Sequence, residues 1–153
     1  MIKILSKFTF VIFIFLASCG YQPIYSDKNA NFKINSISFS GDKNINEVIN
    51  NRLKIYKDVS GSKKIFDLNI NSKFTKIVTS KDTKGNVKIY KIELITEIKT
   101  ILINSKEINK VLKVSSSYNN ISNKFELKQY ENNVIENLAE RIAERIIFTL
   151  QTL

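Results

Sequence analysis

Cys19 carries the only thiol of the chain and is its best-suited side chain for covalent chemistry. Before it stand small Ala17 and Ser18, an apolar run over residues 8–16, and two lysines near the start. This order is typical of a secretory signal that is cut after small residues. The apolar run falls short of the ~20 residues that a helix needs to cross a membrane. We therefore expect residues 1–18 to be removed as a signal peptide, which leaves Cys19 at the new N-terminus.

A specific modification is expected on this thiol. Leu16-Ala17-Ser18-Cys19 resembles the bacterial lipobox, whose peptidase requires small residues before a cysteine that carries diacylglycerol. The resemblance implies lipidation of Cys19, and two or three acyl chains anchor a protein stably because each buried methylene contributes ~0.8 kcal/mol. Gly20 stands where aspartate would resemble an inner-membrane retention signal, so the sorting rule implies the outer membrane, facing the periplasm. The alternative is that Cys19 is only a small apolar residue ending a signal.

The remaining chain predicts one domain behind a short connection. Residues 19–31 hold the only proline, Pro23, and a polar stretch, so they are expected to form the lipidated N-terminus and tether. Residues 32–153 are long enough for one compact domain. Removing residues 1–18 takes away Lys3 and Lys7 and no acid, so the formal net charge falls from +10 to +8.

The side-chain inventory argues against an enzyme. The chain has no histidine and a single cysteine, which excludes Ser-His-Asp and Cys-His nucleophilic sites and almost every zinc site. A glycosidase could still use two carboxylates. The acids, however, stand next to lysines, as in Lys81-Asp82 and Lys106-Glu107, which is typical of solvated surface. We therefore predict no catalysis, no cofactor and no metal.

The positive charge has two interpretations. It could serve an anionic partner such as phosphorylated lipid, whereas secretion argues against nucleic acid. It could equally reflect composition, because Lys, Asn and Ile are abundant together, as in coding sequence rich in adenine and thymine.

The first part of the domain predicts a strand and a helix. Phe32, Ile34, Ile37 and Phe39 alternate with polar residues apart from one slip, which indicates a bulge, and Gly41 ends the strand. A helix of about a dozen residues should follow. Its capping box would be Asn44 with Glu47, and its buried stripe Ile45, Val48, Ile49, Leu53 and Tyr56.

Two strands are expected next. The first begins at Ile65, and its core-facing positions are Phe66, Leu68, Ile70 and Phe74, with Ser72 as the exception. Residues 81–86 predict a hairpin turn. The following long strand would present Tyr90, Ile92, Leu94, Thr96, Ile98 and Leu102 to the core. Its opposite side mixes charged residues with Ile89, Ile95, Ile101 and Ile103. These isoleucines would require another cover, such as a protein partner.

A last strand and helix complete the domain. Residues 104–107 predict a turn, residues 108–118 a strand, and Asn123 with Glu126 a second capping box. The helical stripe would be Leu127, Tyr130, Val134, Leu138, Ile142 and Ile146. The predicted fold is α+β, with two helices packed on one face of a four-stranded mixed sheet in the order β-α-β-β-β-α.

The sequence from Cys19 to Tyr25, Cys-Gly-Tyr-Gln-Pro-Ile-Tyr, resembles the mature start of the LptE family of lipopolysaccharide-assembly lipoproteins. That start is Cys-Gly-aromatic-x-Pro-Leu-Tyr. Weaker likenesses follow at Gly85 and Tyr90, at Ser117-Tyr118-Asn119 with Phe125, and at Leu138–Ile142. The family implies the same sandwich of two helices on a four-stranded sheet.

The resemblance implies a protein that sits inside a large outer-membrane β-barrel (LptD-like), helps it to assemble, and assists delivery of lipopolysaccharide to the cell surface. The family uses basic residues near its sheet hairpins toward lipopolysaccharide phosphates, and Lys81, Lys84 and Lys88 occupy that hairpin here. An ordinary solvated turn is the alternative.

Two further sets could contact the barrel: Tyr21, Pro23 and Tyr25 in the tether, and Ile95 and Ile101 on the outer sheet face. The tether residues could equally pack against the domain. The alternative for the whole protein is a free-standing periplasmic lipid-binding or envelope-scaffold lipoprotein.

Overall fold

The computed structural model describes residues 31–102 and 107–153. The predictions for Cys19, Tyr21, Pro23 and Tyr25, and those for residues 103–106, lie outside the described residues.

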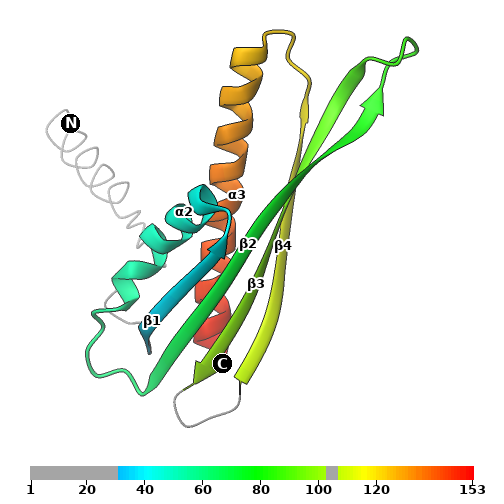
Figure 1. Ribbon diagram of the computed structural model, residues 1–153. Coiled ribbons are helices and arrows are strands. Elements are labelled where there is room, and N and C mark those ends of the chain that lie inside the picture. Colours follow the sequence, from blue (N-terminus) through cyan, green and yellow to red (C-terminus); the bar gives the residue numbers. More distant parts are fainter. Residues whose placement is uncertain (1–30, 103–106) are drawn as a thin grey trace, which may run out of the picture.

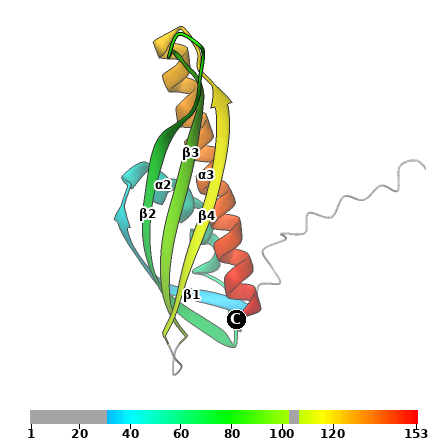
Figure 2. The same ribbon diagram turned by 90° about the vertical axis from the view of Figure 1, so that its right-hand side faces the viewer.

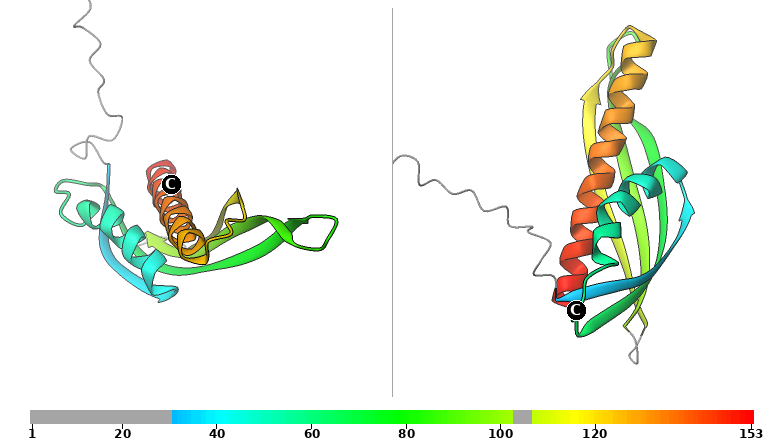
Figure 3. Two further views of the ribbon diagram at one scale, coloured as in Figure 1. Left: turned by 90° about the horizontal axis from the view of Figure 1, so that it is seen from above. Right: turned by 90° about the vertical axis from the view of Figure 1, so that its left-hand side faces the viewer.

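A four-stranded sheet and two helices make up the described domain (Figure 1). In chain order the elements are β1 (Phe32–Gly41), α2 (Lys43–Leu53), the 3-10 turn η2 (Lys54–Tyr56), β2 (Lys64–Lys81), β3 (Val87–Leu102), β4 (Glu107–Asn119) and α3 (Lys124–Thr152). The strands lie in the order β1-β2-β3-β4, with β1 parallel to β2 and the other pairs antiparallel. Both helices cover the same face of the sheet (Figures 2 and 3). The predicted fold class and element order are confirmed.

The connection from β1 to α2 depends on one glycine. The β1–β2 register shifts between Ile34 and Ser36, which confirms the predicted bulge. Gly41 has φ 84°, and a Cβ on it would lie 2.1 Å from the carbonyl oxygen of Ser72. The backbone N–H of Asp42 donates to that same carbonyl at 2.8 Å. Because the end of β1 approaches the backbone of β2 so closely, this position requires glycine.

Side-chain caps begin both helices. The carboxylate of Asp42 accepts hydrogen bonds from the backbone of Asn44 and Ile45, at 3.0 and 3.1 Å. The predicted cap at Asn44 was therefore wrong, because Asp42 has the extended backbone of an N-cap two residues earlier. The predicted cap of α3 is confirmed, since Asn123 accepts from the backbone of Phe125 and Glu126.

The core fills the space between the helices and one face of the sheet. It contains Phe66, Leu68 and Ile70 of β2, Ile92, Leu94 and Ile98 of β3, and Leu138, Ile142 and Ile146 of α3. Two residues predicted to be buried are not: Phe74 is 37% exposed and Tyr130 is 46% exposed. Phe74 lies beyond Ser72, the last residue of β2 that pairs with β1, so that edge of the sheet has no neighbour there. The buried position beside Tyr130 belongs to Glu131 instead.

The sheet extends farther than its helical cover. β2 and β3 continue beyond β1 and α2 as a projecting hairpin (Figure 1). Residues 73–79 of β2 are all exposed. Within the described ranges, no helix is long and apolar enough to cross a membrane.

Replacing Ile142 by aspartate tests the assignment of the buried face of α3. Ile142 is fully buried in the core, so an unpaired charge there should remove about 3–5 kcal/mol of the ~5–15 kcal/mol stability that is usual for a domain. Urea unfolding followed by circular dichroism measures the loss. Glu144→Ala is the control, because Glu144 is exposed on the same helix. Equal unfolding midpoints for the two variants would contradict the packing described.

Candidate functional site

The hairpin between β2 and β3 is held by one aspartate. The Oδ1 atom of Asp82 accepts hydrogen bonds from the backbone N–H groups of Lys84 (2.9 Å) and Asn86 (2.8 Å). Its Oδ2 atom accepts from the Asn86 side chain at 3.0 Å. The Asn86 side chain and backbone, together with the other turn amides, hold the pKa of Asp82 below its usual value. The predicted turn is therefore confirmed and locally ordered.

Three lysines meet at this tip. Lys81 is the last residue of β2 and pairs with Val87 of β3, Lys84 lies in the turn, and Lys88 follows in β3. All three are exposed, and none forms an ion pair with another residue that the structure describes. The carboxylate of neighbouring Asp82 is occupied by turn donors. The structure thus brings the three predicted residues together as a cationic tip that can bind anions.

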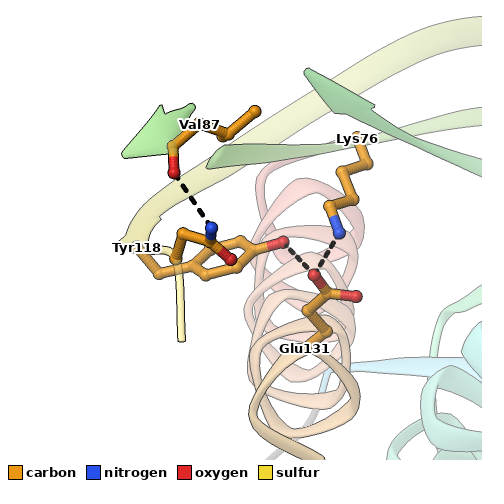
Figure 4. Close-up of polar contacts among 5 residues, drawn as sticks. Lys76, Val87, Tyr118 and Glu131 are labelled. Carbon is orange, nitrogen blue, oxygen red and sulfur yellow. Dashed lines mark hydrogen bonds and ion pairs between the residues drawn. The ribbon is translucent and has the colours of Figure 1, made fainter. Parts of the chain in front are cut away.

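A polar cluster joins the hairpin to α3, and we name it the latch: Lys76, Tyr118 and Glu131 (Figure 4). Glu131 is only 8% exposed. It accepts a hydrogen bond from the Tyr118 hydroxyl at 2.7 Å and forms an ion pair with Lys76. The Lys76 ammonium also lies 3.9 Å from the centre of the Tyr90 ring, which is a cation–π contact. The latch therefore joins β2, β4 and α3.

The electrostatics of the latch suit a structural role. Burial alone would raise the pKa of Glu131, but the hydrogen bonds from Lys76 and Tyr118 outweigh it and lower the pKa. Burial, followed by the bond to the Glu131 carboxylate, raises the pKa of Tyr118 above its ordinary range. At neutral pH the glutamate is thus ionised and the tyrosine protonated. Neither group is poised to exchange protons near pH 7, which is what a general acid or base requires.

The sequence-based interpretation missed the latch. It treated the acids as solvated surface, and for Glu131 this was wrong. A signal was present, because Glu131 follows Leu127 by four residues and precedes Val134 by three, and both are buried. The stripe was assigned to Tyr130, whose ring instead lies against Tyr118 with 5.6 Å between centroids.

The sheet face away from the helices, the outer face, is dominated by polar side chains. Representative members are Ser38, Asn69, Asn71, Thr75, Asn109 and Ser115. Glu93 forms ion pairs with Lys113 at 2.9 Å and Lys91 at 3.2 Å, and these lysines lower its pKa. Hydrogen bonds from Ser36, and then Asn35, lower the pKa of Asp67. Hydrogen bonds and ion pairs thus link several polar side chains of the outer face, which also carries the exposed apolar residues Ile77 and Val111.

The two isoleucines predicted as barrel contacts lie apart on the outer face. Ile95 is half-buried between its cross-strand neighbours Lys73 and Lys113. Ile101 is 47% exposed and has Asp67 and Glu107 as neighbours. Charged residues of β3 separate them, so the structure does not bring them into one apolar patch.

A groove of about 450 Å³ lies between the start of α2 and the middle of α3. Phe74 lies among its lining residues, and Ile45, Val48 and Ile135 add apolar surface. Lys128 and Glu136 stand in the polar part of the lining. In the part of the chain that the structure describes, no three acidic, histidine or cysteine residues gather as metal ligands.

Comparison with known proteins shows the fold. No protein-family model matches the chain, and no curated protein matches it. Rare lipoprotein B from Shewanella oneidensis is similar in structure, with a TM-score of 0.61 and 15% identity over 77% of this chain and 95% of that chain. A minor lipoprotein from Acinetobacter baumannii has a TM-score of 0.52 and 14% identity, over 76% of this chain and 93% of that chain. A lipoprotein from Caulobacter crescentus has a TM-score of 0.52 and 14% identity, over 80% of this chain and 89% of that chain. At these identities the likeness establishes a shared α+β architecture over most of each chain.

Changing Glu131 to glutamine tests the latch through its pH dependence. The folded pKa lies below the ordinary value of 4.5, so the stabilisation is present above that pH and is lost as pH falls through the folded pKa. At pH 7 the free energy of unfolding of the variant should be about 1–3 kcal/mol lower, because its hydrogen bonds are no longer made to a charged group. The difference from the wild type should shrink below about pH 4.

Urea titrations at several pH values measure this difference. Glu136→Gln is the matched control, because Glu136 is exposed on the same helix. A destabilisation by Glu131→Gln that is constant from pH 7 to about pH 3 would show that the carboxylate charge has no role in the latch.

Proposed function

We propose that this chain is a lipid-anchored outer-membrane lipoprotein that sits in the lumen of a large β-barrel, assists its assembly, and helps to deliver lipopolysaccharide to the cell surface. The lipobox-like Leu16–Cys19 and the heptad Cys19–Tyr25 support the anchor and the family resemblance. The solved proteins that share the fold are themselves named as lipoproteins. The proposed role is non-enzymatic, and its partners are the barrel and lipopolysaccharide.

The observation that carries the proposal is the long, uncovered, polar outer face. An antiparallel sheet can keep one face in water, so polarity alone does not require a partner. The interior of a membrane β-barrel is polar, however, and a plug must present hydrogen-bonding side chains to it. β2 has 18 residues and at ~3.3 Å per residue extends about 60 Å. That length exceeds the ~30 Å hydrocarbon thickness, so the hairpin is long enough to extend through a barrel lumen.

Ile95 and Ile101 would contribute separate apolar contacts within this polar face. Because Lys73 and Lys113 flank Ile95, the stems of both lysines can extend the apolar surface while their ammonium groups stay solvated. Tyr21, Pro23 and Tyr25 in the tether would add a contact near the anchor.

The cationic tip would bind lipopolysaccharide phosphates. Lys81, Lys84 and Lys88 have no acidic partner among the described residues, so their charges are available to a ligand. Lysine suits phosphate as a compact, mobile charge, without the bidentate geometry of arginine.

One observation favours the alternative of a free-standing lipid-binding lipoprotein. The groove between α2 and α3 has about 450 Å³ and a mixed lining, in which apolar side chains from both helices and from Phe74 lie beside Lys128 and Glu136. A volume of this size falls within the usual range of ligand pockets. A protein that carries lipid in this groove would need no barrel, and it would be recovered from membranes without one.

Co-purification tests the barrel contact. Ile95→Lys and Ile101→Lys should leave thermal unfolding within about 1 kcal/mol of the wild type, because both side chains point away from the core. Each should reduce recovery of a barrel with tagged protein after mild detergent extraction. Phe148→Lys is the control, since Phe148 is an exposed apolar residue on α3. Wild-type protein recovered alone from native membranes would exclude the barrel and favour the alternative.

Charge reversal at the tip tests lipopolysaccharide binding separately. The triple variant Lys81→Glu/Lys84→Glu/Lys88→Glu should still assemble with the barrel but bind lipopolysaccharide at least about tenfold more weakly at low salt. The deficit should shrink as salt rises, because exposed charges are screened over ~8 Å at physiological ionic strength. Binding equal to the wild type at low salt would remove these lysines from the mechanism.

A further inference from the structure

The end of the domain opposite the hairpin is built around three aromatic rings. Phe32 of β1 stacks on Tyr56 of η2 with ring centroids 4.9 Å apart. Phe32 also meets Phe66 of β2 edge-on at 6.2 Å. All three rings are buried, so this end, the base, has a fixed geometry.

Five lysines lie close to these rings along the chain, and we call them the base patch: Lys33, Lys54, Lys57, Lys63 and Lys64. Lys54 and Lys57 close one 3-10 turn, with the Lys57 N–H donating to the Lys54 carbonyl at 3.1 Å. Lys64 pairs with Phe32 in the parallel ladder and lies on the same face of the sheet as that ring, whereas Lys33 pairs with Ile65 and lies on the opposite face at the same end. The folded chain thus gathers lysines from β1, from η2 and from the start of β2.

The charges of the base patch are not neutralised within the described structure. None of its lysines forms an ion pair there, whereas Lys76, Lys91 and Lys113 do. The Lys54 ammonium donates a hydrogen bond to the Asn51 side chain at 3.2 Å, and this leaves its charge uncompensated.

Few acids lie at this end. Asp58 lies in the same loop, and Asp67 already accepts from Ser36 and Asn35. Glu107 begins β4, at the opposite edge of the sheet from β1. The base therefore keeps an excess of positive charge.

An exposed apolar residue lies within the patch. Ile55 stands between Lys54 and Tyr56 and is 43% exposed. Cations beside an apolar side chain are the combination found on protein surfaces that rest at a lipid interface.

The base patch is also at the end where the chain enters the domain. β1 begins there, beside the loop that follows η2, and the hairpin tip lies at the far end (Figures 1 and 3). Residues 20–31 separate Cys19 from Phe32 and can span at most about 40–45 Å. The base patch therefore lies within this length of chain from Cys19.

We infer that the base patch is a second membrane contact, which binds the anionic phosphate headgroups of phospholipid at the membrane surface. It rests on the proposed function only in that a lipid at Cys19 would hold the base near that surface. An acyl anchor combined with a basic patch holds a protein more firmly than either alone. The patch and the cationic tip would thus have different ligands at opposite ends of the domain.

Vesicle binding tests this contact without the lipid. The chain from residue 19 onward, carrying Cys19→Ser, is sedimented with vesicles of phosphatidylglycerol and phosphatidylcholine, and with phosphatidylcholine alone. Lys54→Gln/Lys57→Gln/Lys63→Gln should weaken binding to the anionic vesicles at least about tenfold, since binding to an anionic surface depends on each cation near it. The comparison variant Lys81→Gln/Lys84→Gln/Lys88→Gln removes the same charge from the tip, and it should weaken binding less than the base-patch variant does.

Several outcomes would overturn the inference. Equal loss in both triple variants would show a general effect of net charge, and greater loss in the tip variant would place the contact there. Equal binding to neutral vesicles would show that charge is not what binds. Thermal unfolding confirms that each variant is folded, and the single variant Lys63→Glu, at an exposed loop position, repeats the test with minimal change to the fold.

The anchor itself is tested by mass spectrometry of Cys19 in protein taken from cell membranes. Absence of an acyl mass there would contradict the proposed function but leave vesicle binding by the base patch intact. Loss of vesicle binding with the acyl mass present would contradict the patch alone.

Discussion

The pairing of β2 with β3 is the constraint on which the rest of the structure depends. These strands pair antiparallel without a shift from Phe66 opposite Leu102 to Val78 opposite Tyr90. Because strand side chains alternate, a slip by one residue would exchange the core face and the outer face. A buried hydrogen bond also fits this register, since the hydroxyl oxygens of the paired residues Ser72 and Thr96 lie 3.2 Å apart in the core.

The length of the paired strands β2 and β3 also shapes the domain. The paired strands extend beyond β1 and α2, so the far part of the sheet packs against α3, with Ile92, Leu94 and Leu127 buried between them (Figure 1). The latch adds to this packing, because Lys76, Tyr118 and Glu131 connect β2 and β4 to α3 through charge-assisted hydrogen bonds. The domain therefore has an aromatic, cationic base, a polar outer face and a cationic tip, each fixed by different interactions.

Much of this architecture could be predicted from the sequence, because strand alternation and helical stripes are local patterns. The alternation around Ile92 and Leu94 predicted the core face of β3, and the Asn123 cap predicted the start of α3. The start of α2 was misplaced because a capping pattern at Asn44 competes with the true cap at Asp42. Local patterns cannot decide between neighbouring positions when tertiary contacts choose one of them.

The functional surfaces were predictable to different degrees. The tip lysines are close in sequence and close across the hairpin, so their grouping follows from the turn itself. Ile95 and Ile101 share a face by alternation, but alternation says nothing about the charged residues that separate them. Glu131 and the base patch depend on long-range pairing. The start of β1, with Lys33, lies at the same end as the start of β2, with Lys64, only because the two strands pair in parallel, which no local pattern shows.

The central claim is that the outer face lies against a protein partner in the membrane. Photo-crosslinking in living cells tests it most directly, with a photoreactive residue placed at Asn71 or Val111, which are exposed on the outer face. Glu144 on the exposed side of α3 serves as the reference position. The account predicts one large crosslinked product, containing a β-barrel, from the two sheet positions and far less from Glu144. Crosslinking from Glu144 alone, or none at any of the three positions, would contradict it.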